Sequence, residues 1–168
     1  MKTLTSAAAN KWIKSLEDEK SYYLSLEESA SVYTLSEGEI TDPPEYDYQK
    51  VNGEIKQIDA TIRKIKHAVN VFNTTTVLPE LGITVDEALV KMAQLNLYRN
   101  KLDIMRRRLP KERVDSFSAR AKTVIEYQYT NYDIEVVKND YKKVSDEIVQ
   151  IQLALDICNQ TQTFKIDL

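Results

Sequence analysis

Apolar residues recur at helical spacing in two long segments of the chain. The first stripe comprises Tyr48, Val51, Ile55, Ile58, Ile62, Ile65, Val69 and Phe72, and the second comprises Ile134, Val137, Tyr141, Val144, Ile148, Ile151, Leu155 and Cys158. Steps of three and four residues alternate without a break, which is typical of helices that pack at small angles in coiled coils. The pattern therefore predicts two long helices, each with one buried face.

Weaker patterns predict two further helices. The first helix has an apolar stripe that Glu19 interrupts and that ends before Gly38: Trp12, Leu16, Tyr23, Leu26, Ala30 and Tyr33. Asp42 is expected to cap the helix that follows it, with Pro43 in the first turn of that helix.

A further helix is expected to begin at Thr84, where Glu87 completes a capping-box pattern. Its stripe is Val85, Ala88, Met92, Leu95, Leu102 and Leu109, before Pro110. Asp133 is expected to cap the last helix.

Two short segments have the features of β structure. "TTTVLPELGIT" is expected to fold as a hairpin near residues 75–84, and the alternation of Ile125, Tyr127 and Tyr129 predicts a strand near residues 123–130. The two are expected to pair. The predicted fold is mainly α: a single domain over residues 1–168, built as an antiparallel bundle of about four long helices with coiled-coil-like packing and a small β element.

Composition and charge agree with a helical protein and narrow its partners. The 168 residues include only 3 Gly and 4 Pro, so few tight turns are expected, and the net charge of -3 does not favour a nucleic-acid partner. The distribution is uneven: residues 15–47 are strongly acidic and residues 91–122 strongly basic. The two segments are therefore expected to attract each other, within one subunit or between subunits.

Features of the sequence also limit the compartment and the chemistry. One cysteine excludes an internal disulfide, and "MKTLTSAAANKW" lacks the apolar core of a secretion signal. No segment has the apolar length of a membrane span. We therefore expect a cytoplasmic protein and no membrane partner.

The candidate reactive side chains do not indicate a catalytic site. His67 lies off the apolar stripe, which favours a solvated side chain, and Cys158 lies on its stripe, which favours a buried one. Without a phosphate loop, paired cysteines or a nucleophile motif, no catalytic residue, metal or cofactor is expected.

Two clusters are candidates for ligand binding. The corner "NVFNTTT" contains Asn70, Asn73, Thr74, Thr75 and Thr76, whose side chains could orient a ligand or a phosphate. The same residue types end helices and close turns, and this structural role is the favoured interpretation of the corner.

The second candidate, "MRRRLPKER", could bind an anion or an acidic partner through a cationic cluster: Arg106, Arg107, Arg108, Lys111 and Arg113. Pairing with the acidic residues 15–47 is favoured, because no aromatic residues are interleaved with this cluster for stacking on bases.

Three segments resemble the septicolysin family, small helical proteins of bacteria: "IRKIKHAVNVFNTTT", "GITVDEAL" and "TVIEYQYTNYDIEVVKNDYKKVSDEIVQIQLALDICN". Its motifs are matched by Asn70, Asn73, Thr76, Thr84, Glu87, Ala88, Leu89, Ile151, Gln152 and Asn159. Gln160 replaces an expected Trp, and Met92-Ala93 replace an expected Arg-Asp pair. The family name implies a haemolysin.

A helical protein that assembles with itself is the function favoured by the stripes and by the ten tyrosines, since tyrosine suits subunit interfaces. Such a protein would be a structural or interaction protein without catalytic activity. The alternatives are a septicolysin-like, membrane-active protein and a small-ligand binder that uses the polar corner at residues 70–76.

Overall fold

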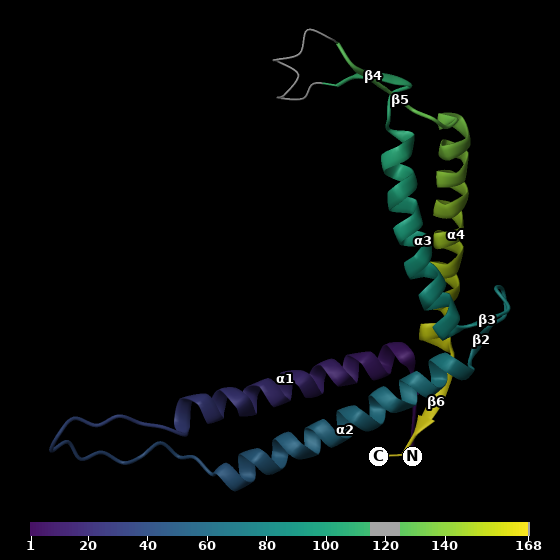
Figure 1. Ribbon diagram of the computed structural model, residues 1–168. Helices are drawn as coiled ribbons and strands as arrows, with labels where there is room; N and C mark the ends of the chain where they lie inside the picture. The colour runs from purple at the N-terminus through teal and green to yellow at the C-terminus, as the bar shows by residue number, and fades with distance from the viewer. Residues whose placement is uncertain (115–124, 168) are drawn as a thin grey trace. The chain divides into compact units, whose positions relative to one another are not determined.

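Helices dominate the computed structural model, which describes residues 1–114 and 125–167. The helices are α1 (Ser6–Ala30), α2 (Tyr48–Thr75), α3 (Val85–Arg106) and α4 (Ile134–Thr161) (Figure 1). The short strands are β1 (Lys2–Thr5), β2 (Val77–Leu78), β3 (Ile83–Thr84), β4 (Lys111–Arg113), β5 (Tyr127–Tyr129) and β6 (Thr163–Ile166). The prediction of a mainly α protein with about four long helices and small β elements is confirmed.

The chain divides into two compact units. One unit comprises Met1–Val77 with Asp156–Leu168, and the other comprises Leu78–Leu155. Each unit contains one pair of long helices that run side by side, α1 with α2 and α3 with α4 (Figure 1). The single domain over residues 1–168 and the packing of all four helices into one bundle stay predictions.

The core of the first unit forms between α1 and α2. Its fully packed residues are Ala9, Ile13, Ile58, Ile62, Ile65 and Ile166. The predicted stripe of α2 thus packs against α1, with the ring of Trp12 and the side chain of Leu16 at the margin. Two ion pairs join the helices at their surface: Lys20 Nζ lies 2.7 Å from Asp59, and Lys66 Nζ lies 3.3 Å from Glu17.

A two-stranded sheet closes the first unit and unites residues from both ends of the sequence. β1 and β6 are antiparallel, with Leu4 opposite Phe164 and Lys2 opposite Ile166. Ile166 is 3% exposed and belongs to the α1–α2 core, and Phe164 packs at its edge. The sheet therefore covers one end of the helix pair with apolar side chains. Neither strand was predicted, since β1 offers a single apolar residue, Leu4, and β6 offers only two, Phe164 and Ile166.

The core of the second unit forms between α3 and α4. Its buried residues are Leu102, Val137, Val144 and Ile148, and Leu95, Met105, Tyr132 and Tyr141 pack against them. Lys91 Nζ lies 2.7 Å from Glu147 across the two helices. The hydroxyl of Tyr132 donates a hydrogen bond of 2.8 Å to the carbonyl of Met105, which ties the start of α4 to the end of α3.

Caps define the starts of α3 and α4 as the sequence predicts, whereas α3 ends at Arg106, before the expected Leu109. Thr84 and Glu87 form the capping box, and Asp133 Oδ1 accepts a hydrogen bond of 2.8 Å from the backbone N–H of Glu135. The small β element expected near residues 75–84 is also present, because β2 and β3 pair there. Gly82 has φ of 66° in the turn before β3, a conformation that glycine adopts without strain.

The predicted start of the second helix is wrong. α2 begins at Tyr48, and its cap is Asp47, whose side chain accepts a hydrogen bond of 3.1 Å from the backbone N–H of Lys50. Asp42 and Pro43 lie upstream, outside any helix or strand. A residue that precedes proline is disfavoured in helical conformation, so Pro44 keeps Pro43 out of a first helical turn. The first helix is also shorter than expected, because it ends at Ala30, before Tyr33.

The predicted partner of the second β segment is wrong as well. β5, which falls within the strand expected near residues 123–130, pairs with β4 and not with the β2–β3 hairpin. Residues 123 and 124 of that expected strand lie outside the described residues. β4 consists of Lys111, Glu112 and Arg113, all exposed, and such a charged run has no apolar alternation by which sequence could reveal a strand.

Replacing Ile65 by alanine should destabilise the protein by about 2–5 kcal/mol, because Ile65 is 0% exposed at the centre of the α1–α2 core. Urea unfolding followed by circular dichroism measures the change. Val71→Ala on the same helix is the matched control, since Val71 is 47% exposed, and its effect should stay within about 0.5 kcal/mol. Equal effects of the two variants would contradict the assigned core.

Replacing Thr84 by alanine should cost about 1 kcal/mol of stability, because the variant loses the side-chain cap of α3. The Thr84 hydroxyl oxygen accepts from the Glu87 N–H at 3.2 Å, and the Glu87 carboxylate accepts from the Thr84 N–H at 2.8 Å. Thr84→Ser keeps the hydroxyl and should retain most of the stability. Thermal unfolding of both variants checks this, and a serine variant as weak as the alanine variant would refute the capping role.

Candidate functional sites

The polar corner at residues 70–76 forms the C-terminal turn of α2. The hydroxyl of Thr74 donates to the carbonyl of Asn70 at 3.0 Å, and that of Thr75 donates to the carbonyl of Val71 at 2.7 Å. The backbone N–H of Thr76 donates to Phe72 at 2.9 Å. These hydroxyl hydrogens are directed at carbonyls of the preceding turn, so the threonines satisfy local backbone groups where the helix ends. The favoured interpretation of the corner as a helix end thus agrees with its geometry.

A shallow hollow of about 450 Å³ adjoins this corner within the first unit. Thr75 and Thr76 line it, whereas Asn70 and Asn73 do not. The rings of Phe72 and Phe164 lie beside it, with centroids 5.0 Å apart. The structure thus separates the predicted ligand-binding residues, since Thr75 and Thr76 line this hollow and Asn70 and Asn73 do not.

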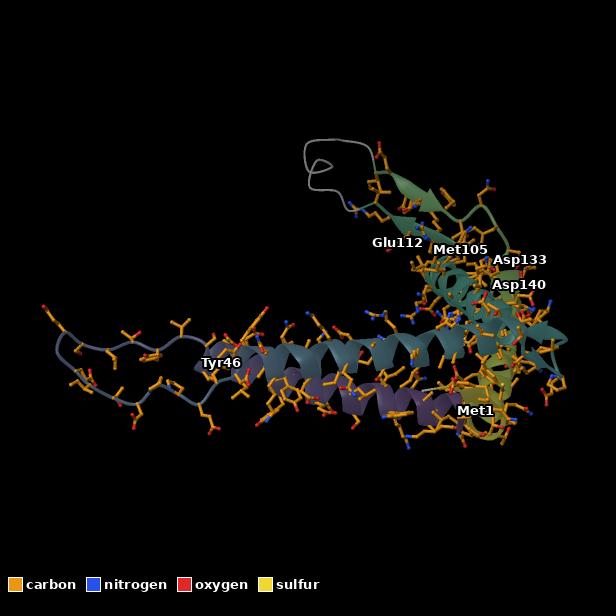
Figure 2. All side chains as sticks on the ribbon, turned by 90° about the horizontal axis from the view of Figure 1, so that it is seen from below. Met1, Tyr46, Met105, Glu112, Asp133 and Asp140 are labelled. Atoms are coloured by element: carbon orange, nitrogen blue, oxygen red, sulfur yellow. The ribbon has the colours of Figure 1, made fainter. Side chains whose placement is uncertain are left out.

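Three arginines of the basic cluster line a larger cleft of about 600 Å³ at the end of α3 and the start of α4. Its lining includes Arg106, Arg107 and Arg108 from one side and Asp133, Glu135 and Lys138 from the other. Figure 2 shows Met105, Glu112 and Asp133 at this end of the helix pair. The cleft therefore brings together cations at the C-terminal end of α3 and mixed charges at the start of α4.

Asp103 neutralises part of this cluster. Its carboxylate lies 2.6 Å from Arg106 Nη2 and 2.7 Å from Arg107 Nη2. The hydrogen bond from Arg106 is the main reason that the pKa of Asp103 is below its ordinary value, and the charge of Arg107 adds to the effect. The Arg106 guanidinium also lies over the Tyr141 ring, 4.0 Å from its centroid. Arg106 is thus held in place by packing and pairing, whereas the side chain of Arg107 is 70% exposed.

Lys111 and Arg113 belong to β4 and not to the lining of the cleft. Lys111 Nζ lies 4.1 Å from the centroid of the Tyr127 ring and 5.5 Å from that of Tyr129. These tyrosines follow the basic cluster by more than ten positions in the sequence, so the sequence did not indicate that they lie beside it. The pairing of β4 with β5 places them beside it.

The remaining candidate chemistry is distributed over the chain. His67 is exposed on α2 and Cys158 is buried in α4. Within residues 1–114 and 125–167, no three histidine, cysteine or carboxylate side chains are grouped closely enough to hold a metal ion. In the same part of the chain, no helix has both the length and the apolar character needed to span a membrane.

Comparisons with known proteins support the fold. No protein-family model and no curated protein matches the chain. A solved structure is similar over 98% of this chain and 100% of its own, with a TM-score of 0.65 and 16% sequence identity. It is the crystal structure of a functionally unknown conserved protein from Corynebacterium diphtheriae. At this identity the likeness shows the fold alone.

Asp103→Asn tests the pairing at the cleft through its pH dependence. Because the folded-state pKa of Asp103 is lowered, its stabilising effect is complete above the ordinary value of 3.8 and is lost as pH falls through the folded-state pKa. Wild type should therefore be more stable than the variant at neutral pH, and the difference should fade in acid. Urea midpoints across this range measure it, with the surface change Asp146→Asn as control. A difference that persists in strong acid would contradict the ion pairs.

Proposed function

We propose that this protein is a non-catalytic interaction protein of the cytoplasm that assembles with copies of itself. The observation behind the proposal is an exposed apolar stripe on the outer side of α3. It comprises Val90, Leu97 and Ile104, which are 52%, 73% and 63% exposed. Large apolar side chains at regular positions on an exposed helix face are typical of a surface that binds another helix.

The stripes that the sequence identified are used inside each unit. Ile58 is 5% exposed in the α1–α2 core, and Ile148 is 9% exposed in the α3–α4 core. Since these inner faces already have partners within the chain, they give no reason for further assembly. The case for an oligomer therefore rests on the outer stripe of α3.

The outer stripe has the spacing of a coiled-coil seam. Its three members are seven residues apart, and helical geometry places them on the side of α3 opposite Leu95 and Leu102. Ala93 and Asn100, both exposed, occupy the alternate seam positions. Their small side chains would let a second helix approach closely. The seam extends about 21 Å at 1.5 Å per residue.

A second copy of the same chain is the partner that we propose for this seam. A two-fold axis would pack α3 of one protomer against α3 of its partner, so that the same stripe is covered on both. The outer side of α4 also carries exposed apolar residues, Val149 and Leu153, 57% and 58% exposed, which lie outside this seam. We also keep the resemblance to the septicolysin family as part of this proposal, on the motif residues Asn70, Asn73 and Thr76.

Leu97→Lys should convert the assembly into monomers, because a lysine ammonium at the centre of the seam would lose its hydration on association. Light scattering behind a sizing column measures the mass over a range of concentrations. The helical circular dichroism of the variant should remain that of wild type, since Leu97 is exposed in the single chain.

Val136→Lys is the matched control for this experiment. Val136 lies on α4, 54% exposed and away from the outer stripes, so its variant should assemble like wild type. A wild-type protein that stays monomeric at high concentration would refute self-assembly. An assembly that survives Leu97→Lys would refute the seam as its interface.

A further inference from the structure

The β4–β5 ribbon has one face that combines cations with aromatic rings. In the antiparallel register Lys111 is opposite Tyr129, and Arg113 is opposite Tyr127. Directly paired residues project to the same face of a two-stranded ribbon, and so do alternate residues of one strand. All four side chains therefore share one face, and Glu112 and Gln128 share the other. We call the first face the basic-aromatic face.

Both rings of this face are accessible to solvent. Tyr127 is 46% exposed and Tyr129 is 63% exposed, although tyrosine rings usually lie at least partly buried. The Lys111 ammonium lies close over Tyr127, within the range of a cation–π interaction. The ribbon thus presents aromatic faces and positive charge at the same place without using them in an apolar core.

Further positive charge adjoins the ribbon at its base. A small hollow there is lined by Arg108, Tyr129 and Thr130, and also by Glu112 and Gln128 from the other face of the ribbon. The backbone N–H of Thr130 donates to the carbonyl of Pro110 at 3.2 Å, which joins the end of β5 to the chain that leaves α3. The side chain of Arg107, 70% exposed, lies in the neighbouring cleft. Arg108 and Arg107 therefore continue the positive charge from the basic-aromatic face to the end of α3, with the carboxylates of Glu112 and Asp103 beside them.

We propose that the basic-aromatic face binds single-stranded nucleic acid. Proteins that bind single strands without sequence preference combine a cationic surface for the phosphates with aromatic side chains on which bases stack. Tyr127 and Tyr129 are two positions apart on one strand, about 7 Å, so each ring can receive a different base. A duplex is less suited, since its bases are already stacked on one another.

The expectation that nucleic acid is not a partner rested on two properties of the sequence. One was the net charge of -3, which averages an acidic segment with a basic one. The other was the lack of aromatic residues among Arg106 to Arg113, which holds along the chain but not across the β4–β5 pairing. The charge alone would equally suit an acidic peptide, whereas the exposed rings favour nucleobases. The inference does not depend on self-assembly.

Fluorescence anisotropy with a labelled oligothymidine of about 12 nucleotides tests the inference on the full chain at low salt. Wild type should bind, and replacing both Tyr127 and Tyr129 by leucine should weaken binding about tenfold or more, since the stacking faces are lost. The double phenylalanine variant keeps the rings and should bind within about twofold of wild type. Absence of binding by wild type, or equal binding by the leucine variant, would overturn the inference.

The salt dependence of the affinity shows whether Lys111 contacts a phosphate of the bound strand. Lys111→Ala should lower the slope of log affinity against log salt by about 0.7, the value for one lost contact to a single strand. Lys101→Ala, on the exposed side of α3, is the matched control and should leave the slope unchanged. Equal slopes for the two variants would place the phosphates elsewhere and overturn the site.

Two competitors test the choice of partner. A peptide that copies residues 31–47, which contain five acids and no base, represents the protein alternative. A duplex of the same length represents the other nucleic-acid form. Failure of both to displace the oligothymidine at equal concentration supports the inference. Displacement by the peptide would assign the face to an acidic protein segment, and stronger binding of the duplex would refute the preference for single strands.

Discussion

Burial of one apolar stripe per helix against one neighbouring helix is the interaction on which both units depend. A polar helix of this length gains little stability alone, so α2 needs α1 and α4 needs α3. Ile65 and Ile62 are buried in the first pair, and Leu102 and Val144 in the second. Removal of either neighbour would expose a full stripe to water. The remaining features occupy the ends and outer sides of these pairs.

Periodicity predicted the helices well because the signal and its cause are both local. The stripes of α2 and α4 and the capping box at Thr84 follow directly from residue spacing. The sheet of β1 and β6 could not be predicted in the same way, since residues 2–5 and 163–166 reveal their pairing only after the helices bring them together. The start of α2 failed for a different reason, because two aspartates could cap it and the effect of Pro44 on Pro43 decided between them.

The candidate sites show the same division between local and non-local information. The threonines of the polar corner bond to carbonyls three or four positions away, so their structural role could be read from sequence. The surroundings of Lys111 could not, because Tyr127 and Tyr129 reach it only through a strand pairing that closes a long loop. The outer stripe of α3 is local and was available in the sequence. It was missed because the stronger inner stripe of the same helix accounted for the pattern.

The two proposed surfaces belong to the same unit, one on α3 and the other on the β4–β5 ribbon, but they use different physics. The outer stripe of α3 would exclude water from apolar side chains and is insensitive to moderate salt, whereas the basic-aromatic face would exchange counterions and weaken as salt rises. Leu97 and Lys111 are separated by the last turns of α3, so a change at one leaves the contacts of the other in place. If α3 does form a two-fold seam, each assembled particle presents two ribbons. A strand long enough to reach both would then bind more tightly than the affinity of one ribbon implies, without any new contact.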